Sequence, residues 1–168
     1  MPTSENSHNR RNYLENEIHT EEDKVLIRSA VQNDRKSWDA LWEGYQDYYE
    51  VDLSGTADNT WQRLMAEQSV GPFCLVCEDD VGDLVGFVTY LFHDHTWHPE
   101  PRCYLVDLYT APEKRGAGIG RALIEAVYEK ADIKGCSQVY WLTQDFNEAG
   151  RRLYDKVAKL TPFIKYQR

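Results

Sequence analysis

The segment that decides the fold of this chain is YLVDLYTAPEKRGAGIGR, which runs from Tyr104 to Arg121. Residues 103–110 form a near-continuous apolar run, which is typical of a central strand. A glycine-rich turn follows, and a helix with an apolar stripe begins near Gly118. Glycines let backbone N–H groups approach an anion closely, and a helix N-terminus carries partial positive charge. The segment therefore predicts a strand–turn–helix unit that binds a phosphate-bearing ligand.

Cationic side chains flank the glycine turn and favour the same kind of ligand. They are Lys114, Arg115 and Arg121. The glycine spacing differs from that of a dinucleotide-binding motif, because the last glycine comes one position early. The Gly-Lys-Ser/Thr ending of a nucleotide-triphosphate loop is absent as well. We therefore expect a phosphate ligand of another kind.

Apolar periodicity on both sides of this unit predicts one mixed α/β domain over residues 24–168, after a polar N-terminal tail over residues 1–23 that we expect to be flexible. Helices are predicted at residues 34–49, around 61–65, at 118–135 and at 147–157. Strands are predicted at residues 25–28, 73–78, 84–92, 103–110, 139–143 and 163–166, with a loop at 93–102. This order is typical of a single sheet with helices on both faces.

The formal net charge of -9 narrows the range of partners. An acidic surface repels nucleic acid and favours amines, polyamines or basic peptides. No apolar run approaches the roughly 20 residues that span a bilayer, and no signal peptide opens the sequence. We therefore expect a cytoplasmic protein with reduced thiols and no membrane association. Cys74 and Cys77 lie in an apolar strand, and His93, His95 and His98 lie in a loop without paired ligands, so we predict no metal site.

The motifs at and after the glycine turn resemble those of a known family. Arg115-x-x-Gly118-x-Gly120 is similar to the (Gln/Arg)-x-x-Gly-x-(Gly/Ala) signature of the GNAT N-acetyltransferases, and Asn147-x6-Tyr154 resembles the pattern of their last helix. Residues 140–143, 153–157 and 163–166 resemble a narrower branch, the fungal and bacterial enzymes related to the histone/polyamine and D-amino-acid acetyltransferases. The resemblance covers residues 25–168.

This resemblance implies a single GNAT-like α/β domain. Its sheet is expected to be mixed, mostly antiparallel and six- to seven-stranded, with about four helices and a splay at the acetyl-CoA site. The glycine turn would hold the coenzyme pyrophosphate through main-chain N–H groups, the strand before it would pair with the pantetheine arm, and an N–H near Leu108 would polarise the thioester carbonyl. The coenzyme contacts implied are Leu108, Tyr109, Thr110, Arg115, Gly116, Ala117, Gly118, Ile119, Gly120, Arg121, Asn147, Glu148 and Ala149.

The resemblance also assigns catalytic roles. Tyr154 would protonate the departing thiolate, with a plain core position as the alternative, and the alternative for Asn147 is a helix N-cap. The amine must lose a proton before it attacks. Asp107 is the expected catalytic carboxylate, with a structural hydrogen-bond acceptor as its alternative role, and Asp145 is the other candidate; either could act through water. Val106 stands where polyamine-specific relatives commonly carry Glu, which argues against a strict spermidine/spermine role.

The sequence therefore predicts an acetyl-CoA-dependent N-acetyltransferase that acts on the primary amine of a small molecule, amino acid or polyamine-like, by direct attack in a ternary complex. Acetylation of lysines in basic protein tails and a non-catalytic acyl-CoA-binding module stay open as alternatives. Aromatic residues of the first helix are expected to cover the acceptor pocket, with core packing as the alternative: Trp38, Trp42, Tyr45, Tyr48 and Tyr49. Because related enzymes often pair C-terminal strands, a homodimer is expected.

Overall fold

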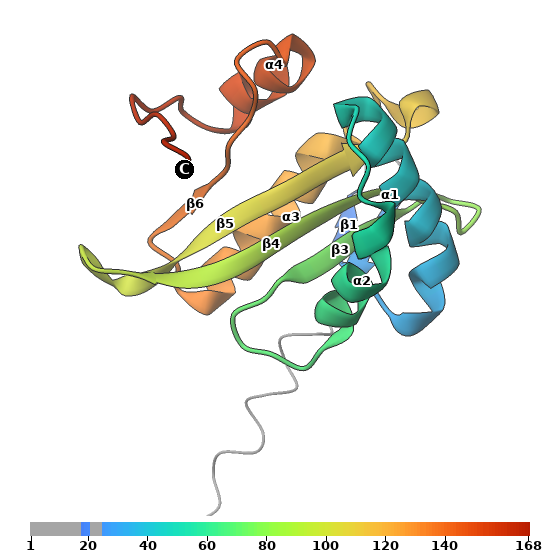
Figure 1. Ribbon diagram of the computed structural model, residues 1–168, viewed down its shortest axis with the longest axis horizontal. Coiled ribbons are helices and arrows are strands. Elements are labelled where there is room, and N and C mark those ends of the chain that lie inside the picture. Colours follow the sequence, from blue (N-terminus) through green and yellow to red (C-terminus); the bar gives the residue numbers. More distant parts are fainter. Residues whose placement is uncertain (1–17, 21–24) are drawn as a thin grey trace, which may run out of the picture.

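A six-stranded sheet forms the centre of the computed structural model, which describes residues 18–20 and 25–168 (Figure 1). The strands lie side by side in chain order: β1 (Ile18–Thr20), β2 (Val25–Ser29), β3 (Phe73–Glu78), β4 (Leu84–His95), β5 (His98–Thr110) and β6 (Gln138–Tyr140). Neighbouring strands are antiparallel except for the parallel pair β5 and β6. The predicted mixed, mostly antiparallel sheet is confirmed for the described residues.

Helices cover both faces of the sheet, as predicted. They are α1 (Arg35–Tyr49), α2 (Ala57–Met65), α3 (Ile119–Lys134) and α4 (Glu148–Val157). On one face, Trp38 of α1 and Trp61 of α2 pack with Phe87 of β4. On the other face, Leu123 and Val127 of α3 belong to the second part of the hydrophobic core. Figure 1 shows α1 and α2 in front of the sheet and α3 behind it. None of the described helices combines the length and apolar content needed to cross a membrane.

The β4–β5 hairpin is longer than the sequence predicted. The expected loop at residues 93–102 is wrong, because β4 continues to His95 and β5 begins at His98. The pairs here are His93↔Arg102 and His95↔His98, with a register shift between them, so Pro99 and Pro101 occupy no registered pair. A strand tolerates proline at such an irregularity, where no ladder hydrogen bond is required of it.

Both ends of the described chain differ from the prediction. Residues 18–20 form β1, inside the expected flexible tail, and pair with β2; the rest of that tail, with residues 21–24, lies outside the described residues. The strand predicted at 163–166 is absent, since residues 158–168 contain no strand or helix. Apolar side chains of this C-terminal segment are exposed: Leu160, Phe163, Ile164 and Tyr166.

The sheet opens between β5 and β6. Pairing is limited to Arg102↔Gln138, Cys103↔Val139 and Tyr104↔Tyr140, and residues 105–110 of β5 have no strand beside them on that edge within the described residues. Ala111 N donates to Val85 O at 2.9 Å, so the backbone groups of Ala111 point toward β4. Backbone groups of successive strand residues point in alternating directions, and those of Leu108 and Thr110 therefore point away from β4 and toward this opening. We refer to the opening beyond Tyr104 and Tyr140 as the β5–β6 gap. The predicted splay of the sheet is thus confirmed.

Candidate coenzyme and acceptor site

The glycine turn presents bare backbone at the start of α3. Gly116 and Gly118 have φ of 86° and 82°, in the left-handed region that glycine adopts without strain. A Cβ added at either position would meet nothing within 4 Å, so the turn opens to the surface. Gly118 is the N-cap of α3, and no side chain caps the first N–H groups of that helix. These N–H groups and the helix dipole are the features that an anionic group requires.

The cationic residues around the turn are held by neighbouring side chains. Lys114 Nζ forms an ion pair with Asp79 at 2.8 Å, and Arg121 pairs with Glu125 at 2.8 Å. The Arg115 guanidinium lies 5.0 Å from the ring centroid of Tyr48, and its Nε donates to Thr110 O at 3.1 Å. Arg115 therefore lies between the glycine turn and the end of β5, where it can also reach an anion held by the turn.

Asn147 lies at the N-terminus of α4, after the chain has left β6. Its Oδ1 accepts from Gly150 N at 3.0 Å, which is the N-cap interaction foreseen as one of its two roles. Its Nδ2 donates to Thr143 Oγ1 at 3.0 Å, and Tyr48 Oη donates to Asn147 Oδ1 at 3.2 Å. This last contact joins α1 to α4. Glu148 and Ala149, the next predicted coenzyme contacts, form the exposed first turn of α4.

Tyr154 is half-buried on the inner face of α4. Its ring packs edge-on against Trp141 with centroids 5.3 Å apart. Burial raises the pKa of Tyr154 to about 12, with smaller contributions from Tyr49 and Tyr48, while a hydrogen bond with Thr143 acts in the opposite direction. The phenol is therefore fully protonated at neutral pH, which is the state that a general acid requires.

Asp107 lies on the α1 face of β5, and two hydroxyl groups hold its carboxylate. Tyr45 Oη donates to Oδ1 at 2.8 Å, and Thr89 Oγ1 donates to Oδ2 at 2.5 Å. Burial and the charge of Asp107 raise the pKa of Tyr45, so this phenol stays a donor. Burial raises the pKa values of Tyr49 and Tyr104, and the charge of Asp107 adds a smaller rise to each. A carboxylate held by a tyrosine and a threonine hydroxyl, with further aromatic rings nearby, suits an ammonium group.

The first-helix aromatics divide between the two roles that the sequence left open. Trp38 and Trp42 are buried in the core with Phe87. Tyr45 contacts Asp107, whereas Tyr48 contacts Asn147. Thr89 was not foreseen from the sequence, because a single threonine in an apolar strand carries no distinguishing pattern. Asp145, the other candidate base, is exposed before α4, where its backbone carbonyl accepts from Arg151.

The cysteines and the histidines of the β4–β5 hairpin form no metal site in the part of the chain that the structure describes. No group of three or more His, Cys, Asp or Glu side chains there is arranged to hold a metal ion. Burial raises the pKa of Cys77 to about 11 and that of Cys103 to about 12. These thiols are therefore protonated at neutral pH and are poor nucleophiles.

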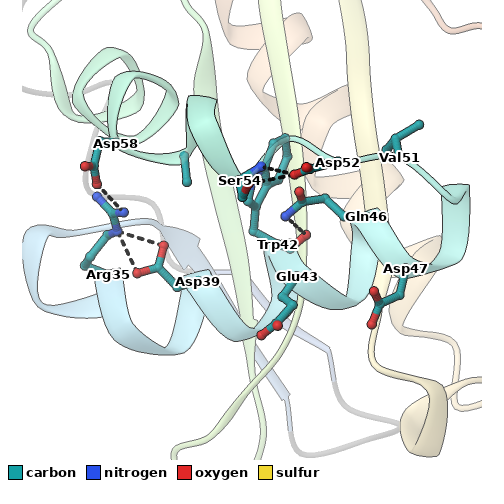
Figure 2. Close-up of a pocket in the computed structure, with 11 residues that line it drawn as sticks. Arg35, Asp39, Trp42, Glu43, Gln46, Asp47, Val51, Asp52, Ser54 and Asp58 are labelled. Carbon is teal, nitrogen blue, oxygen red and sulfur yellow. Dashed lines mark hydrogen bonds and ion pairs between the residues drawn. The ribbon is translucent and has the colours of Figure 1, made fainter.

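A separate acidic hollow lies beside α1 and the turn before α2 (Figure 2). Arg35 bridges Asp39 and Asp58 there, at 2.8 and 2.7 Å. The carboxylate of Asp52 accepts from Ser54. Of the residues predicted for the coenzyme or the acceptor, Trp42 alone is among those that line this hollow, and its side chain is buried in the core. Its charges are thus satisfied largely by local partners, and it is distinct from the β5–β6 gap.

Comparisons with known proteins show the family to which this chain is similar. The model of the Acetyltransferase (GNAT) family matches residues 38–158. A D-amino-acid N-acetyltransferase of Saccharomyces cerevisiae, HPA3, is 33% identical over 147 residues, covering 87% of this chain and 91% of that protein. A thialysine N-epsilon-acetyltransferase of Sus scrofa is 42% identical over 140 residues, covering 77% of this chain and 81% of that protein.

Solved structures share the fold at lower sequence identity. An aminoglycoside N-acetyltransferase, AAC(6')-Iy, in complex with CoA superposes with a TM-score of 0.72 at 18% identity, covering 90% of this chain and 98% of that one. A ribosomal-protein-alanine N-acetyltransferase of Brucella melitensis gives a TM-score of 0.69 at 23% identity, covering 86% and 98%. At these identities the likeness supports the fold alone.

Proposed function

We propose that this chain, which belongs to the acetyltransferase (GNAT) family and is an acetyltransferase enzyme, transfers the acetyl group of acetyl-CoA to the primary amine of a small molecule. The observation that carries this proposal is the β5–β6 gap. The gap exposes unpaired β5 backbone, and the uncapped start of α3 follows the end of β5. Tyr154 of α4 and Asp107 of β5 would act there as the acid and the base. Each feature supplies one requirement of acetyl transfer from a thioester.

The coenzyme would bind along the gap. The N–H groups of the glycine turn and of the first turn of α3 would hold the pyrophosphate, and Arg115 would add charge from the side. The amide groups of pantetheine would pair with the outward backbone of Leu108 and Thr110, as an added strand does. Thr110 O accepts from the Arg115 side chain, and its second lone pair can accept from a donor on this edge.

The reaction would be a direct transfer. The amine nitrogen attacks the thioester carbonyl carbon, the N–C bond forms, and the C–S bond breaks after the charge on oxygen has been stabilised by the N–H of Leu108. Tyr154 gives its proton to the departing thiolate. The proton lost by the amine passes through water to Asp107, which also attracts the incoming ammonium group.

The pKa of Tyr154 is compatible with this proton transfer. A thiol in water has a pKa of roughly 8.5, which alone would make a phenol of pKa about 12 a weak donor to it. Burial of the thioester in the bound complex would make the departing thiolate more basic than a thiolate in water, which would bring the transfer closer to balance.

An acyl-enzyme intermediate on cysteine has no support among the described residues. The thiols of Cys74, Cys77 and Cys103 are buried, and burial raises the pKa of each. Cys136 is half-buried, and its pKa is raised by burial as well. Direct attack within a ternary complex therefore agrees best with the chemistry that the site offers.

We expect release of free coenzyme A thiol from acetyl-CoA in the presence of small primary amines. The measurement is thiol release across amino acids of both hands, diamines, polyamines and a basic histone-like peptide. Strong turnover with a small amine supports the proposal. Turnover with the peptide alone would shift the substrate to lysines of basic protein tails. Tight acetyl-CoA binding with no amine-dependent release would favour a non-catalytic binding module.

We also propose that the enzyme is a homodimer that buries the C-terminal segment. Leu160, Phe163, Ile164 and Tyr166 are between 75% and 89% exposed in the single chain, which is unusual for four large apolar residues within seven positions. We expect light scattering to give twice the chain mass of 19.6 kDa, and truncation after Ala158 to give a monomer. A monomeric mass for the full chain would refute this assignment.

A further inference from the structure

Arg102 lies in the hairpin half of β5, next to Cys103, whose side chain is buried in the core on the α3 face. Figure 1 shows the β4–β5 hairpin extending past α1 and α2. Arg102 is in register with His93 of β4 and with Gln138 of β6. Asp107 is in register with Thr89, and a register shift between Thr89 and Tyr90 places Tyr104 and Arg102 on the same face of β5 as Asp107. The two opposite charges therefore share one face of one strand.

The charge of Arg102 has no counterpart in the described structure. Its Nε is buried without a hydrogen-bond partner, and no ion pair to Arg102 occurs among residues 18–20 and 25–168. The two other buried nitrogen atoms without a partner belong to Trp38 and Trp42, which are uncharged. Burying part of a guanidinium without an anion costs more free energy than burying an unpaired indole N–H. The absence of an anion is notable in a protein of net charge -9, which has many carboxylates.

The polar groups of His93 and Tyr140, the neighbours of Arg102, are occupied by hydrogen bonds with each other and with Asp94 O, so Arg102 is the charged donor on this surface. His93 Nδ1 lies 2.9 Å from Asp94 O, so this nitrogen carries a proton, and Nε2 lies 3.0 Å from Tyr140 Oη. In the neutral ring, Nε2 accepts the Tyr140 proton, and the hydroxyl reaches across β5 from β6 to β4. Burial raises the pKa of Tyr140, and the nearby charge of Arg102 opposes that rise.

The surface between the two charges is aromatic. Tyr104 lies between Arg102 and Asp107 on the strand, and its ring packs against that of Tyr140 with centroids 5.1 Å apart. Five residues of strand at about 3.3 Å each would span about 16 Å, and the position lost to the register shift reduces the separation of the two Cα atoms to about 13 Å. The reach of the two side chains shortens this span. The remaining length suits an extended chain of several methylene groups.

We infer that Arg102 binds the carboxylate of the acceptor, and that the preferred acceptor is a free ω-amino acid whose amine and carboxylate are separated by about four to five methylene groups. Its ammonium group would lie near Asp107, its methylene chain along Tyr104 and Tyr140, and its carboxylate against the Arg102 guanidinium. This inference rests on the proposed amine-acetylating function and narrows the substrate class. Diamines and polyamines place a second positive charge at Arg102 and are disfavoured, whereas α-amino acids hold their charges too close together.

Binding of simple probes tests the inference independently of turnover. The probes are 6-aminohexanoate, its neutral analogue 6-aminohexanamide, 1,5-diaminopentane and alanine of both hands, titrated by calorimetry into the protein with coenzyme A present. We expect 6-aminohexanoate to bind at least about tenfold more tightly than the amide, as a hydrogen-bonded charged pair requires. Equal affinity for the acid and the amide would overturn the inference, and so would tighter binding of the diamine.

Substitution of the arginine locates the effect. In Arg102→Met, the affinity for 6-aminohexanoate falls to that of the amide, while the affinity for the amide is unchanged; Arg102→Lys keeps part of the preference. Arg63→Met removes an equal charge from the exposed face of α2 and leaves the preference intact. If Arg102→Met fails to fold, as judged by circular dichroism, Arg102→Lys and the probe series on the native protein still test whether Arg102 binds the carboxylate.

The same probes separate this inference from the proposed function. Amine-dependent thiol release with 1,5-diaminopentane and 6-aminohexanoate at equal kcat/KM would leave the acetyltransferase assignment standing and refute the role of Arg102. Selective binding of 6-aminohexanoate without thiol release from acetyl-CoA would support the carboxylate site and refute acetylation of this acceptor class.

Discussion

Tyr154→Phe is expected to lower kcat by about 10²- to 10³-fold, within the range that a positioned general acid contributes. The phenol sits half-buried on α4 with its pKa raised to about 12, so it keeps its proton until the thiolate departs. Phenylalanine retains the edge-on packing against Trp141 and removes only the hydroxyl. The loss should therefore appear in kcat, while the dissociation constant of coenzyme A stays within about twofold.

Tyr90→Phe is the matched control for this substitution. Tyr90 is also a buried tyrosine with a raised pKa, but it belongs to the core on the α3 face, where it packs with Phe73 and Phe92. Its variant should keep native kcat. Native kcat in Tyr154→Phe, with unchanged coenzyme binding, would remove Tyr154 from the acid role and leave it as a packing residue.

The pH profile gives a second measure of the same assignment. Because the pKa of Tyr154 is raised, its acid form persists throughout the range from pH 6 to 10. The native rate should then rise with pH as the acceptor amine loses its proton, without a fall near pH 10 that ionisation of an ordinary tyrosine would cause. A descending limb centred near pH 10 would indicate an exposed phenol or a different acid.

The sequence was most informative where local chemistry decides the structure. The glycines at 116 and 118 predict a turn with φ above zero, and the structure has it. The three- and four-residue spacing in α1 predicts one apolar face. It does not show which residues of that face pack in the core and which contribute to the candidate site. That boundary falls between Trp42 and Tyr45, because Tyr45 reaches the carboxylate of Asp107 on β5, a contact across 62 residues.

Features that depend on pairing between distant strands were not predictable in the same way. The register shift beside Tyr90 determines which side chains share a face with Asp107, and nothing in the apolar run of β5 reveals it. Lys114 was expected to attract the coenzyme, yet Asp79 of the β3–β4 turn neutralises it. The strand predicted at 163–166 has the composition of a strand but no neighbour in the single chain, and a strand exists only when it is paired.

Gly118→Ala is expected to weaken coenzyme A binding by about tenfold or more. Residue 118 has a φ of 82° at the N-cap of α3, where alanine costs roughly 1–2 kcal/mol of conformational energy. The added methyl group would also project from the open side of the turn, where the proposed pyrophosphate would bind. Losing one hydrogen bond to a charged group costs about 1.5–3 kcal/mol, which corresponds to roughly 10- to 150-fold in affinity. Calorimetric titration with coenzyme A measures this directly.

Gly82→Ala separates the loss of affinity from the loss of stability. Gly82 also has a positive φ, 91°, and a Cβ there meets only Glu78 Oε1, at 3.9 Å, in the β3–β4 turn. Chemical denaturation should show that both variants lose about the same free energy of unfolding, since both force alanine into the left-handed region. Only Gly118→Ala should lose coenzyme affinity. If the two variants bind coenzyme A equally well, the pyrophosphate is held elsewhere, and the backbone N–H groups at the start of α3 lose the role that the glycine spacing assigns to them.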